Sequence, residues 1–126
     1  MGTHEIEDAF VQSWDWIERF YRDDLLSQAT WRWIGAMPTL ISGLRERGYD
    51  RVLRAGQSLF VLILSRAREH GLRDTQPFVA IERLRDGSMK LTSRVAGRET
   101  TLTRPTTAIC GELLGMLDRL RSEPVD

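Results

Sequence analysis

Regularly spaced apolar residues mark the first segment of the chain, from Glu5 to about Leu25. They recur every three or four positions, which is the spacing of one face of an α-helix, at Ile6, Ala9, Phe10, Trp14, Ile17, Phe20 and Tyr21. Acidic residues in the first turn favour the positive end of the helix dipole, and they are Glu5, Glu7 and Asp8. The pattern predicts an amphipathic helix.

All four tryptophans lie in the first third of the chain, as the pairs Trp14/Trp16 and Trp31/Trp33. The centre of the predicted apolar side follows Ile6, Phe10, Ile17 and Phe20. Trp14 and Trp16 then lie about 70–90° to either side of it, so we expect both rings at the rim of the core. The second pair shares one face if its segment is extended and diverges by about 200° if it is helical. Core and exposed positions both stay open for Trp31 and Trp33.

A second helix is predicted to begin near Met37-Pro38, because proline suits the first turn of a helix. Its apolar side consists of Leu40, Ile41 and Leu44. The segment ends in "LRERGY", where Gly48 is followed by an apolar residue, and "AREHGL" repeats this ending at Gly71. Glycine in the left-handed conformation between two apolar residues is a common helix stop. The sequence therefore predicts helix ends at Gly48 and Gly71.

The apolar run "LFVLIL" precedes the second of these stops. We expect a buried helix over Ser58–His70, with Ser58 as its cap. Periodicity does not decide short apolar runs. A strand over "FVLILS", in a hairpin that starts at Arg51 and turns around "AGQS", is the alternative.

From Pro77 the period changes to alternation. The segments "FVAIERL", "SMKLTSRV" and "ETTLTR" are separated by "RDGS" and "AGR", which contain hairpin-turn residues. They predict a three-stranded antiparallel meander. The positions expected to face the helices are Val79, Ile81, Met89, Leu91, Val95 and Leu102. Those expected to face outward are Lys90, Thr92, Arg94, Thr101 and Thr103.

A last helix is predicted to start at Pro105. Its apolar side consists of Ile109, Leu113, Met116, Leu117 and Leu120, and Gly111 and Gly115 are expected to allow close approach of another element. The chain is thus expected to form a single α+β domain over residues 1–126. Its N-terminal helices precede the meander, and its C-terminal helix packs on one face of the sheet.

Composition indicates an ordinary soluble globular protein, with 126 residues, 41% hydrophobic and 29% charged. No apolar run approaches the roughly 20 residues of a membrane span. The first residues lack the pattern of a signal peptide, so we expect a cytoplasmic protein without membrane contact. Eighteen basic residues balance eighteen acidic ones, which makes nucleic-acid binding less expected. All the basic residues except Lys90 are arginines, which suit protein interfaces but also reflect GC-rich codon usage.

Candidate chemistry is sparse. A single cysteine, Cys110, excludes an intrachain disulfide and a cysteine-built metal site, and we expect it to pack as a small core residue. His70 is expected to cap the predicted helix end, and Asp23 and Asp24 are expected to be solvated. No phosphate-binding loop or hydrolase motif occurs. We therefore expect a protein that is not an enzyme and that has no catalytic residues, cofactor or metal.

Binding to another protein fits the residue types better. Trp31, Arg32 and Trp33 are of the types that dominate interface hot spots. The polar sheet face, with Lys90 and Arg94, offers a second contact surface. The sequence predicts these five residues as the contacts with a protein partner. The oligomeric state is left open.

Two other functions compete with this one. A nucleic-acid-binding transcriptional regulator would use the sheet face and the arginines Arg83, Arg94, Arg98 and Arg104. A small enzyme would need His70 and Cys110 to meet in one cleft.

The segment Leu53–Val79, through the run "RAGQSL…LSR…HGLR…QP", resembles small bacterial immunity proteins of polymorphic toxin systems, particularly the TriTu-type family. The resemblance covers about the middle third of the chain and contains no catalytic motif. It implies a cytoplasmic protein that protects its producer by binding a cognate toxin and blocking its active site or its docking. No site residues are carried over from the family.

Overall fold

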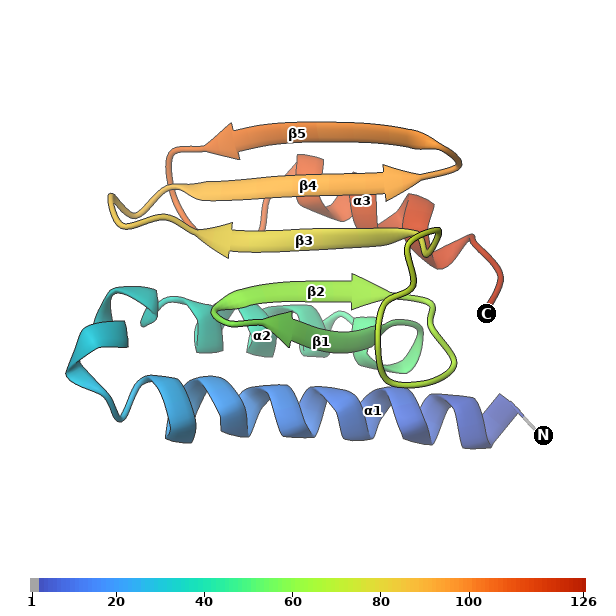
Figure 1. The fold of residues 1–126 in the computed structure, drawn as a ribbon, viewed down its shortest axis with the longest axis horizontal. Coiled ribbons are helices and arrows are strands. Elements are labelled where there is room, and N and C mark those ends of the chain that lie inside the picture. The colour runs from blue at the N-terminus through green and yellow to red at the C-terminus, as the bar shows by residue number, and fades with distance from the viewer. Residues whose placement is uncertain (1–2) are drawn as a thin grey trace.

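A five-stranded antiparallel sheet forms the centre of the protein, and its strands follow one another in chain order (Figure 1). The computed structural model describes residues 3–126. The strands are β1 (Arg54–Ser58), β2 (Val61–Ser65), β3 (Phe78–Arg83), β4 (Met89–Val95) and β5 (Arg98–Arg104). The α-helices are α1 (Thr3–Arg19), α2 (Met37–Glu46) and α3 (Gly111–Arg121). A π-helical turn over Phe20–Leu25 extends α1, and a 3-10 helix over Ala29–Ile34 precedes α2.

Alternation along the strands separates a covered face of the sheet from an open face. Across the covered face the register aligns Leu62 with Ile81, Ile81 with Leu91, and Leu91 with Leu102. Helices α2 and α3 cover this face, which is the far side of the sheet in Figure 1, and α1 runs along the edge of the sheet next to β1. The predicted meander, with its inward and outward positions, is therefore confirmed. The sheet has five strands rather than three, because two further strands precede the meander.

Side chains of α1 and of the π-helical turn that extends it bond to backbone groups of β1 and of the residues on either side of it. The indole Nε1 of Trp14 donates to the Leu53 carbonyl at 2.8 Å, and the Ala55 N–H donates to Ser13 Oγ at 2.9 Å. The Tyr21 hydroxyl donates to the Phe60 carbonyl at 2.6 Å. Burial raises the pKa of Tyr21, so this hydroxyl keeps its proton. An uncovered edge strand is a template for pairing with other chains, and α1 removes that hazard at β1.

The predicted N-terminal helix is confirmed, but the centre of its apolar side differs from the expectation. The fully buried residues are Phe10, Trp14, Ile17 and Tyr21. Trp14 is therefore a core residue and not a rim residue, since its indole N–H finds a backbone carbonyl instead of water. Trp16, on the other side of the helix, is 45% exposed.

The expected helix over Ser58–His70 is wrong. Strands β1 and β2 form a hairpin here, with Ser58 paired to Val61, and β2 also pairs with β3. The strand alternative is confirmed for the apolar run, although "AGQS" lies within β1 and the chain turns at Leu59-Phe60. His70 consequently caps no helix. The stop at Gly48 is confirmed by its φ of 85° and by its N–H bond to the Arg45 carbonyl at 2.9 Å.

The C-terminal helix begins at Gly111, six residues after the predicted start. Four of the five residues expected on its apolar side are buried, namely Leu113, Met116, Leu117 and Leu120, whereas Ile109 lies before the helix and is only partly buried. The close approach expected at Gly111 and Gly115 is not found, because no other element lies within 4 Å of a Cβ built there. It occurs at Gly43 in α2, where an added Cβ would lie 2.7 Å from Ile109 Cδ1.

We predict that Trp14→Phe lowers the free energy of unfolding by at least about 2 kcal/mol, because it removes buried volume and leaves the Leu53 carbonyl without its donor. Urea denaturation followed by circular dichroism measures the change. Trp16→Phe is the matched control and should change stability by less than about 0.5 kcal/mol. Equal losses in the two variants would contradict the assigned role of Trp14.

We also predict that Leu59→Gly stabilises the fold. Leu59 adopts a φ of 52° in the turn between β1 and β2, a left-handed conformation that disfavours side chains. Glycine relieves this strain but loses more entropy on folding, so the net gain should be about 0.5–1 kcal/mol. Leu72→Gly is the control, because Leu72 is also exposed but has no positive φ. A loss of stability in Leu59→Gly would refute the strain.

Candidate protein-binding groove

The second tryptophan pair joins the 3-10 helix to the β1–β2 hairpin. The rings of Trp31 and Trp33 lie 5.5 and 4.9 Å from the Phe60 ring, and both are half-buried against the core. The Arg83 Nε donates to the Trp33 carbonyl at 2.6 Å, and the Arg85 guanidinium lies 5.3 Å from the Trp33 ring. The structure therefore gives Trp31 and Trp33 a packing role, which the sequence left undecided.

The five predicted contact residues do not form one patch. Arg32 is exposed beside the two half-buried tryptophans. Lys90 and Arg94 lie on the open face of β4, and β3 separates them from the hairpin. The Arg94 guanidinium lies 4.8 Å from the Phe78 ring and donates to the Gln76 carbonyl at 3.3 Å.

The residues of the two competing functions are also dispersed. Register places Arg83, Arg98 and Arg104 on the covered side of the sheet and only Arg94 on the open face. His70 lies in the loop after β2, near the open face, whereas Cys110 packs against the core just before α3. Within residues 3–126, no group of three His, Cys, Asp or Glu side chains is placed to hold a metal ion.

A groove runs over β1 on the open side of the sheet. It consists of two adjoining hollows of about 110 and 310 Å³, which share Arg54–Gln57 and His70 in their linings. Trp16 and Ser13 of α1 form one wall. His70, Gly71 and Leu72 of the loop between β2 and β3 form the other. Figure 1 shows this loop crossing in front of β1 and β2 toward α1.

Gly56 makes the groove deep, because it has no side chain to fill the floor. It pairs with Ile63, and a Cβ built on Gly56 would approach nothing closer than the Ile63 carbonyl at 3.9 Å. Trp16 and Leu72, which line the two walls, are 45% and 40% exposed. Of residues 3–126, only these two and Leu59 are large apolar side chains that stay exposed.

Two arginines fix the segment Arg66–Arg68, from which the chain continues into the loop wall. Arg54 donates from Nε to the Ala67 carbonyl at 2.8 Å and from Nη2 to the Arg68 carbonyl at 2.6 Å. Arg66 donates to the Val52 carbonyl at 2.7 Å and to the Glu123 carbonyl at 2.8 Å. Burial lowers the pKa of both guanidinium groups, but arginine stays protonated in proteins. The start of the loop is thus fixed before any partner binds, which reduces the entropy cost of binding.

Comparison of the chain with protein-family models, with curated proteins and with solved structures found no match. A search of the part of the chain that the structure describes found no helix with the length and apolarity needed to cross a bilayer.

Sequence reasoning missed the groove residues Trp16, Gly56 and Leu72. For Trp16 a signal existed, because a helix centred on Phe10, Trp14, Ile17 and Tyr21 places position 16 about 130° from that centre. For Gly56 and Leu72 there was none, since both positions acquire their place in the groove from the pairing of β1 with β2 and the path of the loop.

We predict that Trp16 is the tryptophan most accessible to solvent. Acrylamide should quench a red-shifted component of the native emission, and Trp16→Phe should remove that component. Trp14→Phe should leave it in place, because the Trp14 ring is fully buried. If a Trp31→Phe/Trp33→Phe double variant removed the component and Trp16→Phe did not, the exposed ring would belong to the second pair.

Proposed function

We propose that this protein is a non-enzymatic inhibitor that binds another protein through the groove over Gly56. The observation that supports this most is the groove itself, with an exposed apolar side chain on each wall. Trp16 stacks on Phe20, with ring centroids 5.4 Å apart and planes within 7°, so its position is held before binding. Rigid aromatic anchors beside a pocket are typical of interface hot spots.

We further propose that the partner is a toxin and that the protein acts as an immunity protein. The run that resembles immunity proteins contains the groove residues Arg54–Gln57 and His70–Leu72. Segments that resemble this family therefore supply the floor and the loop wall. An inhibitor of this kind needs no chemistry of its own, since it works by occupying a surface that the toxin uses.

Lys90 and Arg94 lie on the same open face as the groove, and we propose them as outer contacts. Charges at the rim of an interface speed encounter with a partner more than they add affinity. Trp31, Arg32 and Trp33, which the sequence predicted as the leading contact, stay a prediction. They lie next to the hairpin turn where the exposed Leu59 projects.

The proposal is tested by filling the groove. Gly56→Val places two methyl groups on the floor, and valine also suits a strand better than glycine. Tagged wild-type protein and variants are used to retrieve partners from the cells that produce them. We expect one partner to be retained by the wild type and weakened at least about tenfold, or about 1.4 kcal/mol, by Gly56→Val and by Trp16→Ala.

Thr39→Ala is the matched control, because Thr39 is exposed on α2. This helix lies on the side of the sheet opposite the groove. Thermal unfolding confirms that each variant is folded. The partner is then expressed in a host cell, where it should arrest growth unless the wild-type protein is present. Equal retention by Gly56→Val and wild type would remove the groove from the proposal. A partner that does not harm the host would remove the immunity role.

A further inference from the structure

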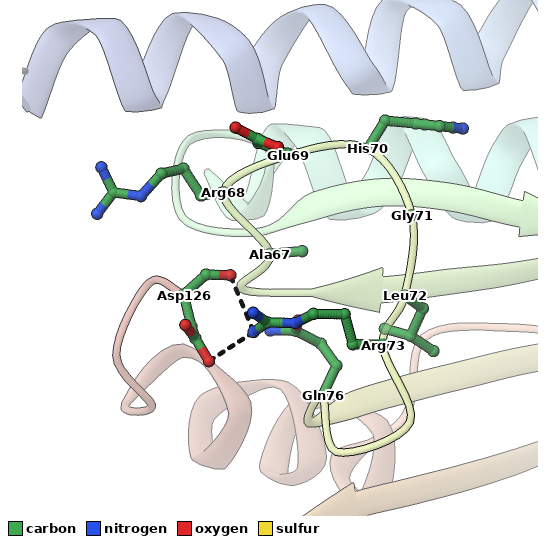
Figure 2. Close-up of a pocket in the computed structure, with 9 residues that line it drawn as sticks. All are labelled: Ala67, Arg68, Glu69, His70, Gly71, Leu72, Arg73, Gln76 and Asp126. Carbon is green, nitrogen blue, oxygen red and sulfur yellow. Dashed lines mark hydrogen bonds and ion pairs between the residues drawn. The ribbon is translucent and has the colours of Figure 1, made fainter.

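A second cavity, of about 460 Å³, lies against the same loop (Figure 2). Its lining consists of Ala67, Arg68, Glu69, His70, Gly71, Leu72, Arg73, Gln76 and Asp126. His70, Gly71 and Leu72 also line the groove, so the loop contributes to both sites. Figure 2 shows the side chains of Arg73, Gln76 and Asp126 gathered on one side of the cavity.

Gln76 contributes a buried hydrogen-bond donor that has no partner. The residue is only 1% exposed, and its Nε2 makes no hydrogen bond within residues 3–126. Its Oε1 accepts a bond from Arg73 Nε at 3.1 Å, which determines which end of the amide carries the oxygen. Buried polar groups are nearly always hydrogen-bonded. A free amide N–H in a cavity wall therefore indicates a ligand with an acceptor atom.

Arg73 contributes a positive charge that is paired with an exposed carboxylate. Its Nη2 lies 2.6 Å from the Asp126 Oδ2 and donates to the Asp126 carbonyl at 3.3 Å, as the two dashed lines in Figure 2 show. The side chains of this pair are 57% and 67% exposed. Exposed ion pairs contribute little to stability. Another oxyanion can therefore take the place of the Asp126 carboxylate without a large cost to the fold.

We propose that this cavity binds the carboxylate or phosphate group of a small ligand. One oxygen of the group accepts a bond from Gln76 Nε2, and another accepts from the Arg73 guanidinium in place of Asp126. Guanidinium groups bind both oxyanions through paired donors. Ala67 and Leu72 provide apolar contacts for the rest of the ligand. This site is separate from the proposed protein-binding function and does not depend on it.

The test follows the side-chain amide of Gln76 by two-dimensional NMR of the ¹⁵N-labelled protein. Sodium acetate and inorganic phosphate are titrated separately, with sodium chloride at the same ionic strength as the reference. We expect a saturable shift of the Gln76 amide and Arg73 Nε–H signals with one or both anions. Saturation by acetate alone would identify a carboxylate ligand, and saturation by phosphate alone a phosphate ligand.

Two variants make the result specific. Asp126→Asn removes the competing carboxylate and should tighten anion binding about three- to tenfold. Gln76→Glu replaces the amide donor with a carboxylate beside Arg73 and should abolish binding, while circular dichroism checks that the variant is folded. The proposal is overturned if the shifts match those with chloride, do not saturate, or persist in Gln76→Glu. It is also overturned if a bound water gives a cross-peak to the Gln76 amide that neither anion displaces.

Discussion

The fold depends on the hydrogen bonds that α1 and the π-helical turn after it make to backbone groups of β1 and its flanking residues. The Trp14 indole N–H donates to the Leu53 carbonyl, and the Tyr21 hydroxyl donates to the Phe60 carbonyl. Ser13 Oγ accepts a bond from the Ala55 N–H. Buried backbone groups without partners are costly, so these bonds fix both the position of the helix and its rotation about its own axis. Once Trp14 points into the core, Trp16 must project toward the open side of β1. The wall of the groove is thus a consequence of how the sheet edge is protected.

Several arginines of this protein donate hydrogen bonds to backbone carbonyls. Arg54, Arg66 and Arg83 each donate to main-chain carbonyls of segments distant in sequence. The planar fork of a guanidinium suits such multiple bonds better than an ammonium group does. The loop after β2 has no regular secondary structure, and the bonds from Arg54 to the Ala67 and Arg68 carbonyls fix its first residues. This use of arginine gives a structural reason for arginine rather than lysine at these positions.

The groove is formed by residues of three different elements, and none of these residues forms a hollow by itself. Trp16 comes from a helix, Gly56 from an edge strand and Leu72 from a loop, and none belongs to a recognisable motif. A hollow forms where the strand has no side chain and where two exposed apolar residues flank it. The same loop has an unsatisfied amide and an exposed ion pair on the side of the second cavity. Two hollows of different character, one apolar and one polar, therefore share a single loop.

The sequence by itself determined the elements whose pattern repeats over many residues. It determined α1, α2, the stop at Gly48 and the inward and outward positions of β3 to β5, because local periodicity and turn residues suffice there. For the run before Arg66 it favoured a helix, which was wrong, since a short apolar run fits helix and strand alike until it pairs with β3. Only the tertiary structure decided which tryptophan is exposed, because that depends on where the Leu53 carbonyl lies. The groove could not be predicted from the sequence either, because its walls meet only after α1, β1 and the loop have packed together.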